Sequence, residues 1–253
     1  MKILRSLWFY GVLFFSTVLM GPAAAVAGLV LSKQCWAHLL GRLWGNLNLR
    51  TAGVSVTVYG LERIDREKPY VFVANHQSTF DIFAILGRLP VQFRWLAKQE
   101  LFAVPVLGLA MRGIGHIPID RRDRRKAVES LNAAADQVRA GTSIVVFPEG
   151  TRSRDGVLQD FKRGGFVLAT KSKQPIVPIS ISGSHKILPK RGDWVVNPGH
   201  ITMTISDPIR TDMSSPRDRG ILIGRVRDAI RLHLKSTEGG LAADSLGQQR
   251  ATP

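Results

Sequence analysis

Cysteine is almost missing from this chain of 253 residues, in which Cys35 is the only example. A single cysteine excludes an intramolecular disulfide framework and a zinc site built from several thiolates. Its sequence neighbourhood predicts a small apolar packing residue rather than a nucleophile. The cysteine content is therefore compatible with a reducing location that faces the cytosol.

Acidic residues are also scarce, with 19 Asp and Glu against 35 Lys and Arg, which gives a formal net charge of +16. Such an excess predicts attraction to polyanions, namely nucleic acid, anionic lipid head groups or phosphorylated substrates. The charge alone does not choose among these three classes of partner.

Several functional patterns are missing as well. No Gly-x-Ser-x-Gly motif is present, which argues against a serine hydrolase. No internal repeat or second globular domain is indicated by a chain of this length and composition. We expect neither a metal nor a bound cofactor, because most of the histidines are dispersed and show no metal-ligand spacing. These dispersed histidines are His38, His116, His185, His200 and His233.

Charge is also absent from residues 7–31, which follow Lys2 and Arg5. Gly21-Pro22 predicts a break after a first helix of about 14 residues, roughly 21 Å long and shorter than the hydrocarbon thickness of about 30 Å. A second apolar stripe at helical spacing predicts an amphipathic helix at an interface. The stripe consists of Cys35, Trp36, Leu39, Leu40, Leu43, Trp44 and Leu47, with Lys33, His38 and Arg42 off it. A two-helix anchor that dips into the membrane, a simple span and a cleaved signal peptide all remain open.

From residue 54 onward, short apolar runs alternate with helical patterns, which predicts an α/β fold with a central mixed or parallel sheet flanked by helices. We therefore expect a membrane-anchoring helical segment over residues 1–50, a catalytic domain over 51–238 and a disordered tail over 239–253. The predicted strands are 54–59, 70–74, 93–97, 114–119, 144–147, 176–182 and 201–206. The predicted helices are 82–86, 100–112 (started or kinked by Pro105), 123–139, 160–171 and 221–234.

The polar segment from Asn75 to Asp81 joins a predicted buried strand to a helix. Ligands of open α/β sheets bind beyond the carboxyl ends of the strands, so this turn is a candidate site. If Ser78 or Thr79 caps the helix, the Asp81 carboxylate can accept the Nδ1 proton of His76 and leave Nε2 free as a base. The structural alternative is a capped turn with a hydrogen-bonded histidine.

A second turn, from Phe147 to Ser153, contains Glu149, Gly150, Thr151 and Arg152. Gly150 permits a tight turn, and the Arg152 guanidinium suits a phosphate or carboxylate, while Glu149 can hold that arginine or a substrate hydroxyl. The alternative is an ordinary polar turn with a surface ion pair.

Asp120 and Arg121 likewise stand at the carboxyl end of a predicted strand, after Ile117-Pro118-Ile119. The alternative is a helix cap at Asp120 and a solvated basic face formed by Arg121, Arg122, Arg124 and Arg125. Pro178, within the run Ile176 to Ile179, is typical of an edge strand.

In this order and spacing, these stretches resemble the 1-acylglycerol-3-phosphate acyltransferase family, over roughly residues 70–182. The resemblance implies a base and its orienting carboxylate at His76 and Asp81. It also implies acceptor recognition by Arg121 and by Glu149, Gly150, Thr151 and Arg152, and a structural or acyl-site role near Pro178. The stretch Lys162-Arg163-Gly164-Gly165 also looks similar to the family, and its alternative is the basic start of a helix.

The chemistry of acyl transfer agrees with this resemblance. Attack of a hydroxyl on an acyl thioester requires a base, and a neutral imidazole suits that role without any acyl-enzyme. We expect the donor to be acyl-CoA or acyl-acyl carrier protein, used as a substrate, and the acceptor to be a lysophospholipid, most simply 1-acyl-glycerol-3-phosphate. We also expect membrane lipid as a partner, no nucleic acid, and a place on the inner (cytoplasmic) membrane with the catalytic domain facing the cytosol.

Two alternatives remain. The acceptor is a different lyso-lipid, such as a lyso-amino-acid lipid, or the chain is a membrane-tethered module that binds anionic lipid or nucleic acid. Thioester-dependent activity separates the second alternative from an enzyme.

Overall fold

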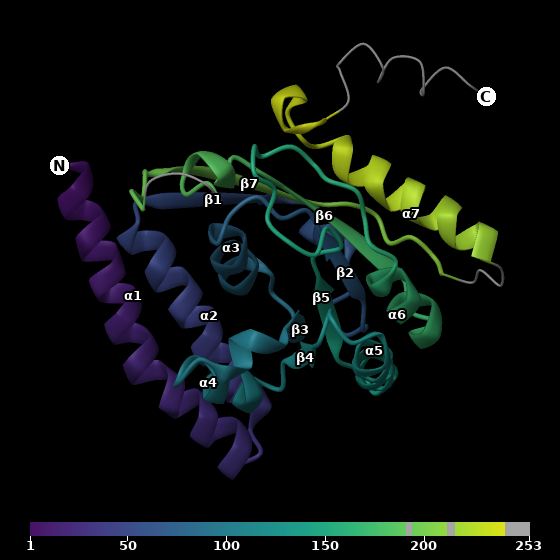
Figure 1. The fold of residues 1–253 in the computed structure, drawn as a ribbon, viewed down its shortest axis with the longest axis horizontal. Helices are drawn as coiled ribbons and strands as arrows, with labels where there is room; N and C mark the ends of the chain where they lie inside the picture. Colours follow the sequence, from purple (N-terminus) through teal and green to yellow (C-terminus); the bar gives the residue numbers. More distant parts are fainter. Residues whose placement is uncertain (191–193, 212–215, 241–253) are drawn as a thin grey trace.

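A seven-stranded sheet forms the centre of the computed structural model, which describes residues 1–190, 194–211 and 216–240 (Figure 1). The strands follow the order β1-β7-β6-β2-β5-β3-β4. Every neighbouring pair is parallel except β6 with β7, so the sheet is mixed, as predicted. The strands are β1 (Val54–Tyr59), β2 (Val71–Ala74), β3 (Phe93–Lys98), β4 (Ile117–Ile119), β5 (Ser143–Val146), β6 (Ile176–Ser182) and β7 (Gly199–Ile205).

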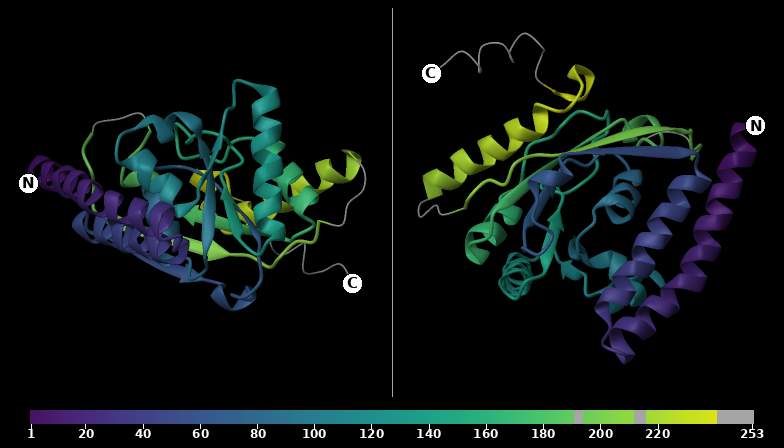
Figure 2. Two further views of the ribbon diagram at one scale, coloured as in Figure 1. Left: turned by 90° about the horizontal axis from the view of Figure 1, so that it is seen from below. Right: turned by 180° about the vertical axis from the view of Figure 1, so that it is seen from behind.

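Helices cover both faces of this sheet (Figures 1 and 2). The first face is packed by α1, α2 and α3, and the second by α5, α6 and α7. The helices are α1 (Lys2–Ala25), α2 (Gln34–Thr51), α3 (Phe80–Arg88), α4 (Leu107–Ile114), α5 (Arg124–Arg139), α6 (Gly164–Ser172) and α7 (Pro216–Arg231). Shorter helical turns are η1 (Val26–Val30), η2 (Leu61–Arg63), η3 (Gln99–Ala103), η4 (Ser184–Lys186) and η5 (Ser236–Glu238).

The side chains of β2 explain why this strand lies inside the sheet. Phe72 and Ala74 pack toward α1–α3, whereas Val71 and Val73 pack toward α5–α7, and all four are fully buried. Successive residues of a strand point to opposite faces, so a continuous apolar run fits a sheet that is covered on both sides.

The N-terminal helix is longer than predicted, and the predicted break at Gly21-Pro22 is wrong. Helix α1 runs through Pro22 to Ala25 and continues as the π-helical turn η1. Packing against α4 overrides the local cost of the proline, because Gly21 contacts Val106, and Gly28 lies against the backbone of Gly113. Helices α1 and α2 lie side by side along one edge of the molecule (Figure 2).

Helices α1 and α2 together form the N-terminal hairpin, and both leave large apolar side chains exposed. Trp8, Phe14 and Phe15 are exposed on α1, and Trp36 and Leu43 on α2. Within the described residues, one helical stretch, Lys2–Val30, is long and apolar enough to cross a membrane, and a third of its most apolar part is buried against the rest of the chain.

Several element boundaries differ from the predictions. Pro105 separates η3 from α4. Ile114 ends α4 instead of opening a strand, because Gly115 closes the helix in the left-handed conformation. Helix α6 begins at Gly164 rather than residue 160, and α7 at Pro216 rather than Ile221.

The predicted disordered tail lies almost entirely outside the described residues, of which only 239 and 240 belong to it.

Candidate functional site

The turn between β2 and α3 brings His76 and Asp81 together. Thr79 is the N-cap residue of α3, and Asp81 lies in its first turn. His76 Nδ1 is 2.8 Å from Asp81 Oδ2, the hydrogen bond that the sequence predicts, and Nε2 is therefore available for proton transfer.

The Asp81 carboxylate is fully buried and organises the whole turn. Its Oδ2 atom also accepts hydrogen bonds from the backbone N–H groups of Gln77 (2.7 Å) and Ser78 (2.8 Å). Its Oδ1 atom is buried without a hydrogen-bond partner among the described residues. One oxygen thus fixes both the histidine ring and the backbone that carries it.

Glu149 has different partners from those the sequence suggests. It is 3% exposed, and its two oxygens accept the backbone N–H groups of His76 (2.6 Å) and Gln159 (3.1 Å). Burial raises the pKa of Glu149 to about 8, partly offset by these two donors. Glu149 therefore joins the β5 turn to the turn that holds His76.

The turn after β5 lies at the same edge of the sheet, because β5 pairs in parallel with β2. Gly150 adopts the left-handed conformation (φ 74°), as its predicted role in a tight turn requires. A Cβ atom there would stand 2.9 Å from Lys162 Nζ, so this lysine lies over the turn. The Arg121 guanidinium, just beyond β4, donates to the carbonyl oxygen of Gly150.

Arg152 and Thr151 bring further polar groups to this place. Arg152 donates from Nη1 to Thr79 Oγ1 (2.9 Å), which links it to the His76 turn and not to Glu149. Lys190 Nζ donates to Thr151 Oγ1 and to the carbonyl oxygen of Arg152, both at 2.8 Å. The carboxyl edge of the sheet thus holds an imidazole beside four basic side chains, those of Arg121, Arg152, Lys162 and Lys190.

Comparison with known proteins identifies the family to which this arrangement belongs. Residues 55–182, or 128 of the 253 residues, match the family model described as Acyltransferase. A 1-acyl-sn-glycerol-3-phosphate acyltransferase of Saccharomyces cerevisiae is 36% identical over 216 residues, which cover 83% of this chain and 70% of that relative. The chain belongs to the acyltransferase family.

Other relatives of this acyltransferase chain carry the same description. The chloroplastic 1-acyl-sn-glycerol-3-phosphate acyltransferase BAT2 of Brassica napus is 36% identical over 178 residues, which cover 70% of this chain and 51% of that protein. The chain spans about half the length of several curated relatives that it matches.

A solved structure gives a more complete match. The crystal structure of the 1-acyl-sn-glycerophosphate (LPA) acyltransferase PlsC from Thermotoga maritima superposes with a TM-score of 0.78 and 26% identity, covering 100% of this chain and 97% of that one. The predicted resemblance to 1-acylglycerol-3-phosphate acyltransferases and the predicted α/β fold are confirmed.

Pro178 does not lie at the edge of the acyltransferase sheet, so the edge-strand interpretation is wrong. It lies within β6, between β2 and β7, and pairs with Val73. The ladder to β7 is interrupted between the pair Ile179–Ile205 and the bridge Ile176–Ile209, so the absent N–H of Pro178 removes no regular ladder bond.

Sequence reasoning missed the aromatic partner of His76 in this acyltransferase. The Phe147 ring stacks on the imidazole with centroids 3.9 Å apart and planes 10° apart, and Trp95 stacks on Phe147 at 5.2 Å and 20°. The stack depends on β3, β5 and β2 being neighbours, an order that the sequence pattern does not contain.

The structure corrects one prediction at the N-terminal side of α2, where Cys35 is exposed rather than packed. His38, which lies off the apolar stripe of this helix, is 1% exposed. Burial and the nearby Arg94 and Arg42 lower the pKa of His38 to about 3, so its imidazole is neutral. Within the described residues, no group of three or more metal-ligating side chains occurs.

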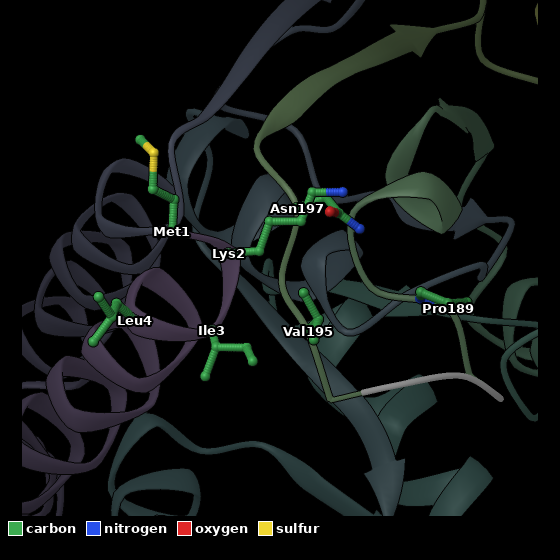
Figure 3. Close-up of a pocket in the computed structure, with 7 residues that line it drawn as sticks. All are labelled: Met1, Lys2, Ile3, Leu4, Pro189, Val195 and Asn197. Carbon is green, nitrogen blue, oxygen red and sulfur yellow. The ribbon is translucent and has the colours of Figure 1, made fainter.

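A hollow of about 730 Å³ lies between the start of α1 and the segment near Pro189 and Val195 (Figure 3). Its walls are mainly apolar, and Lys2 adds a positive charge. The hollow does not include His76, but it adjoins the site along the chain, because Leu188, next to Pro189, accepts a hydrogen bond from Ser78 Oγ (2.8 Å).

Proposed function

We propose that this chain transfers a fatty acyl group from an acyl thioester to the free hydroxyl of 1-acyl-glycerol-3-phosphate and so forms phosphatidic acid. The observation that carries the proposal is the His76–Asp81 hydrogen bond beside the basic turn at Gly150 to Arg152. The family membership and the names of the relatives support the same reaction.

In the proposed mechanism, His76 is the general base and Asp81 its orienting carboxylate. The acceptor oxygen attacks the thioester carbonyl carbon while its proton moves to His76 Nε2. The C–S bond then breaks, and the leaving thiolate takes up the proton from the imidazolium. Asp81 fixes the tautomer through Nδ1 and stabilises the imidazolium, so no side chain is acylated.

The basic groups around the β5 turn supply a site for the acceptor phosphate. The Arg152 and Arg121 guanidiniums offer several fixed donors, and Lys162 and Lys190 add positive charge above the same turn. Gly150 and Thr151 shape this site through their backbone and hydroxyl positions. Glu149 contributes indirectly, since its carboxyl group holds the His76 backbone.

The donor is acyl-CoA or acyl-acyl carrier protein, each of which presents negative charge to a chain of net charge +16. The thioester is already activated, so the proposed reaction needs no separate cofactor.

The N-terminal hairpin is proposed as an interfacial anchor. Helix α1 packs along the domain, with Phe9 buried and its ring 5.4 Å from that of Phe80, so a bilayer crossing by α1 alone would pull this contact apart. Its outer side and that of α2 remain apolar and exposed, as suits a helix pair lying in one leaflet. We place the chain on the inner (cytoplasmic) membrane, with the catalytic domain facing the cytosol and membrane lipid as a partner.

The test is an acceptor panel with purified full-length protein in detergent micelles. Each lyso-lipid, including a lyso-amino-acid lipid, is offered with acyl-CoA and with acyl-acyl carrier protein. We expect phosphatidic acid from 1-acyl-glycerol-3-phosphate at the highest kcat/KM. A higher kcat/KM for an acceptor without phosphate would change the proposed substrate, and no transfer from either thioester would favour a lipid-binding or nucleic-acid-binding module.

A further inference from the structure

A stack of three rings lies across three neighbouring strands, at the carboxyl ends of β2 and β5 and within β3. His76 follows β2, Phe147 follows β5, and Trp95 lies in β3. The sheet order places β5 between β2 and β3, so Phe147 lies between the imidazole and the indole.

We propose that Phe147 is a positioning residue for His76, holding the imidazole against Asp81 and stabilising the imidazolium that forms during acyl transfer. The inference rests on the proposed function, in which His76 takes a proton. Phe147 itself touches neither proton nor substrate in this scheme.

The geometry supports both parts of this role. A nearly parallel contact at 3.9 Å restricts rotation of the imidazole about its Cβ–Cγ bond, which keeps Nδ1 at Asp81 and fixes the direction of Nε2. The negative face of an aromatic ring also attracts a cation that lies over it, and this attraction is larger where water is excluded. The ring therefore favours the protonated form that the proton transfer to His76 generates.

Trp95 holds Phe147 in place from the other side. It is buried, and its Nε1 atom has no hydrogen-bond partner among the described residues. The indole is thus positioned by ring packing, with Phe147 on one side and Phe93 at its edge (5.3 Å, 88°).

The charged groups near His76 come from several segments, and Arg121, Lys162 and Lys190 reach the neighbouring β5 turn from outside it. Asp81 faces it from α3. Glu149 binds its backbone from the β5 turn, where Arg152 reaches Thr79 and Lys190 contacts Thr151. A substitution of Phe147 changes none of these charges, so its effect on the pH profile reports on the ring itself.

The test compares Phe147→Leu with Phe147→Tyr in the full-length enzyme. The leucine keeps apolar bulk and removes the aromatic face, whereas the tyrosine keeps the face. We expect Phe147→Leu to lower kcat roughly tenfold, the ratio that corresponds to 1.4 kcal/mol, with KM for either substrate changed less than about twofold. The acid limb of its pH–rate profile should move to lower pH, because the cationic form of His76 loses support. Phe147→Tyr should restore both kcat and the acid limb.

Two further variants keep the test decisive. Phe72→Leu, in the buried core of β2 with its ring against that of Tyr70, should lower the melting temperature but leave kcat and the acid limb unchanged. Trp95→Leu should show part of the effect expected for Phe147→Leu. It replaces Phe147→Leu in the test if that variant fails to fold. Normal kcat and an unmoved acid limb in Phe147→Leu, or in Trp95→Leu when that variant alone folds, would overturn the inference. The proposed function would still stand in that case, provided that His76→Ala is inactive in the same assay.

Discussion

Glu149 combines a buried carboxyl group with two backbone donors, one of which belongs to His76. Its pKa, raised by burial from 4.5 to about 8, makes the native state hold a proton that the unfolded chain releases. The stability that this proton contributes is fully present below pH 4.5 and is lost as the pH rises through 8, so the unfolding free energy falls between these values.

The predicted consequence is a pH-dependent difference between wild type and Glu149→Gln. The wild-type unfolding free energy relative to the variant should fall by up to about 1.4 kcal/mol per pH unit between pH 5 and pH 8. Denaturant titrations in detergent at several pH values measure this slope. A difference that is constant with pH, or rises with it, would mean that Glu149 is ionised in the native protein.

Arg152 belongs to the proposed phosphate site, so its substitution should act on the acceptor. Arg152→Ala should raise the acceptor KM roughly 10- to 100-fold, the range expected for a hydrogen bond to a charged group, and leave the donor KM nearly unchanged. Arg152→Lys should also be impaired, because an ammonium does not reproduce a bidentate guanidinium. The exposed Arg154, two residues away, provides the control Arg154→Ala. Equal effects of Arg152→Ala on both KM values would move phosphate recognition elsewhere, for example to Lys162.

For individual residues, the sequence predicted contacts within one turn better than contacts between strands. The spacing of His76 and Asp81 and the glycine at 150 were sufficient, because cap geometry and left-handed backbone are local properties. The partners Phe147 and Lys190 come from other segments, and their positions depend on strand order.

Among the elements, α1 and its extension η1 depend on close packing against α4. A Cβ atom on Gly28 would overlap the carbonyl oxygen of Gly113, whereas one on Gly11 would meet nothing within 4 Å. Gly28→Ala should therefore destabilise the protein by about 1–3 kcal/mol, while Gly11→Ala should stabilise it by about 0.5–1 kcal/mol. Thermal unfolding of the two variants measures the contrast. Equal melting temperatures would show that α1 does not dock on α4 in solution.

Some element boundaries have a local signal in the sequence, whereas others depend on contacts between distant elements. Local signals were present for the end of α4 at Gly115 and for the start of α7 at Pro216, and both follow ordinary capping rules. The passage of α1 through Pro22 had no local signal, because it depends on glycine contacts with α4, a helix more than 80 residues away. Strands β1 and β6 matched their predicted bounds, since both are rich in β-branched residues, which favour strands.

For the whole molecule, an excess of positive charge and an exposed apolar hairpin predict two separable modes of membrane binding. Binding to anionic vesicles should weaken with salt, whereas binding to neutral vesicles should persist in salt. Replacing Trp8, Phe15 and Trp36 with serine should reduce binding to neutral vesicles at least tenfold, because each aromatic buries a large apolar area.

Tyr59→Ser serves as the control for this experiment, since Tyr59 is an exposed aromatic residue on β1 rather than on the hairpin. Flotation assays with both vesicle types give the readout. Unchanged binding of the triple variant to neutral vesicles would rule out the hairpin as the anchor, and salt-sensitive binding alone would indicate attachment by charge.

A labelling experiment separates direct acyl transfer, with His76 as the base, from a route through an acyl-enzyme. Wild type and His76→Ala are each given labelled acyl thioester, first without acceptor and then with 1-acyl-glycerol-3-phosphate. We predict an unlabelled wild-type protein, labelled phosphatidic acid once the acceptor is added, and a rate at least roughly 100-fold lower for His76→Ala. Label trapped on the protein, or an ordinary rate in His76→Ala, would contradict this mechanism.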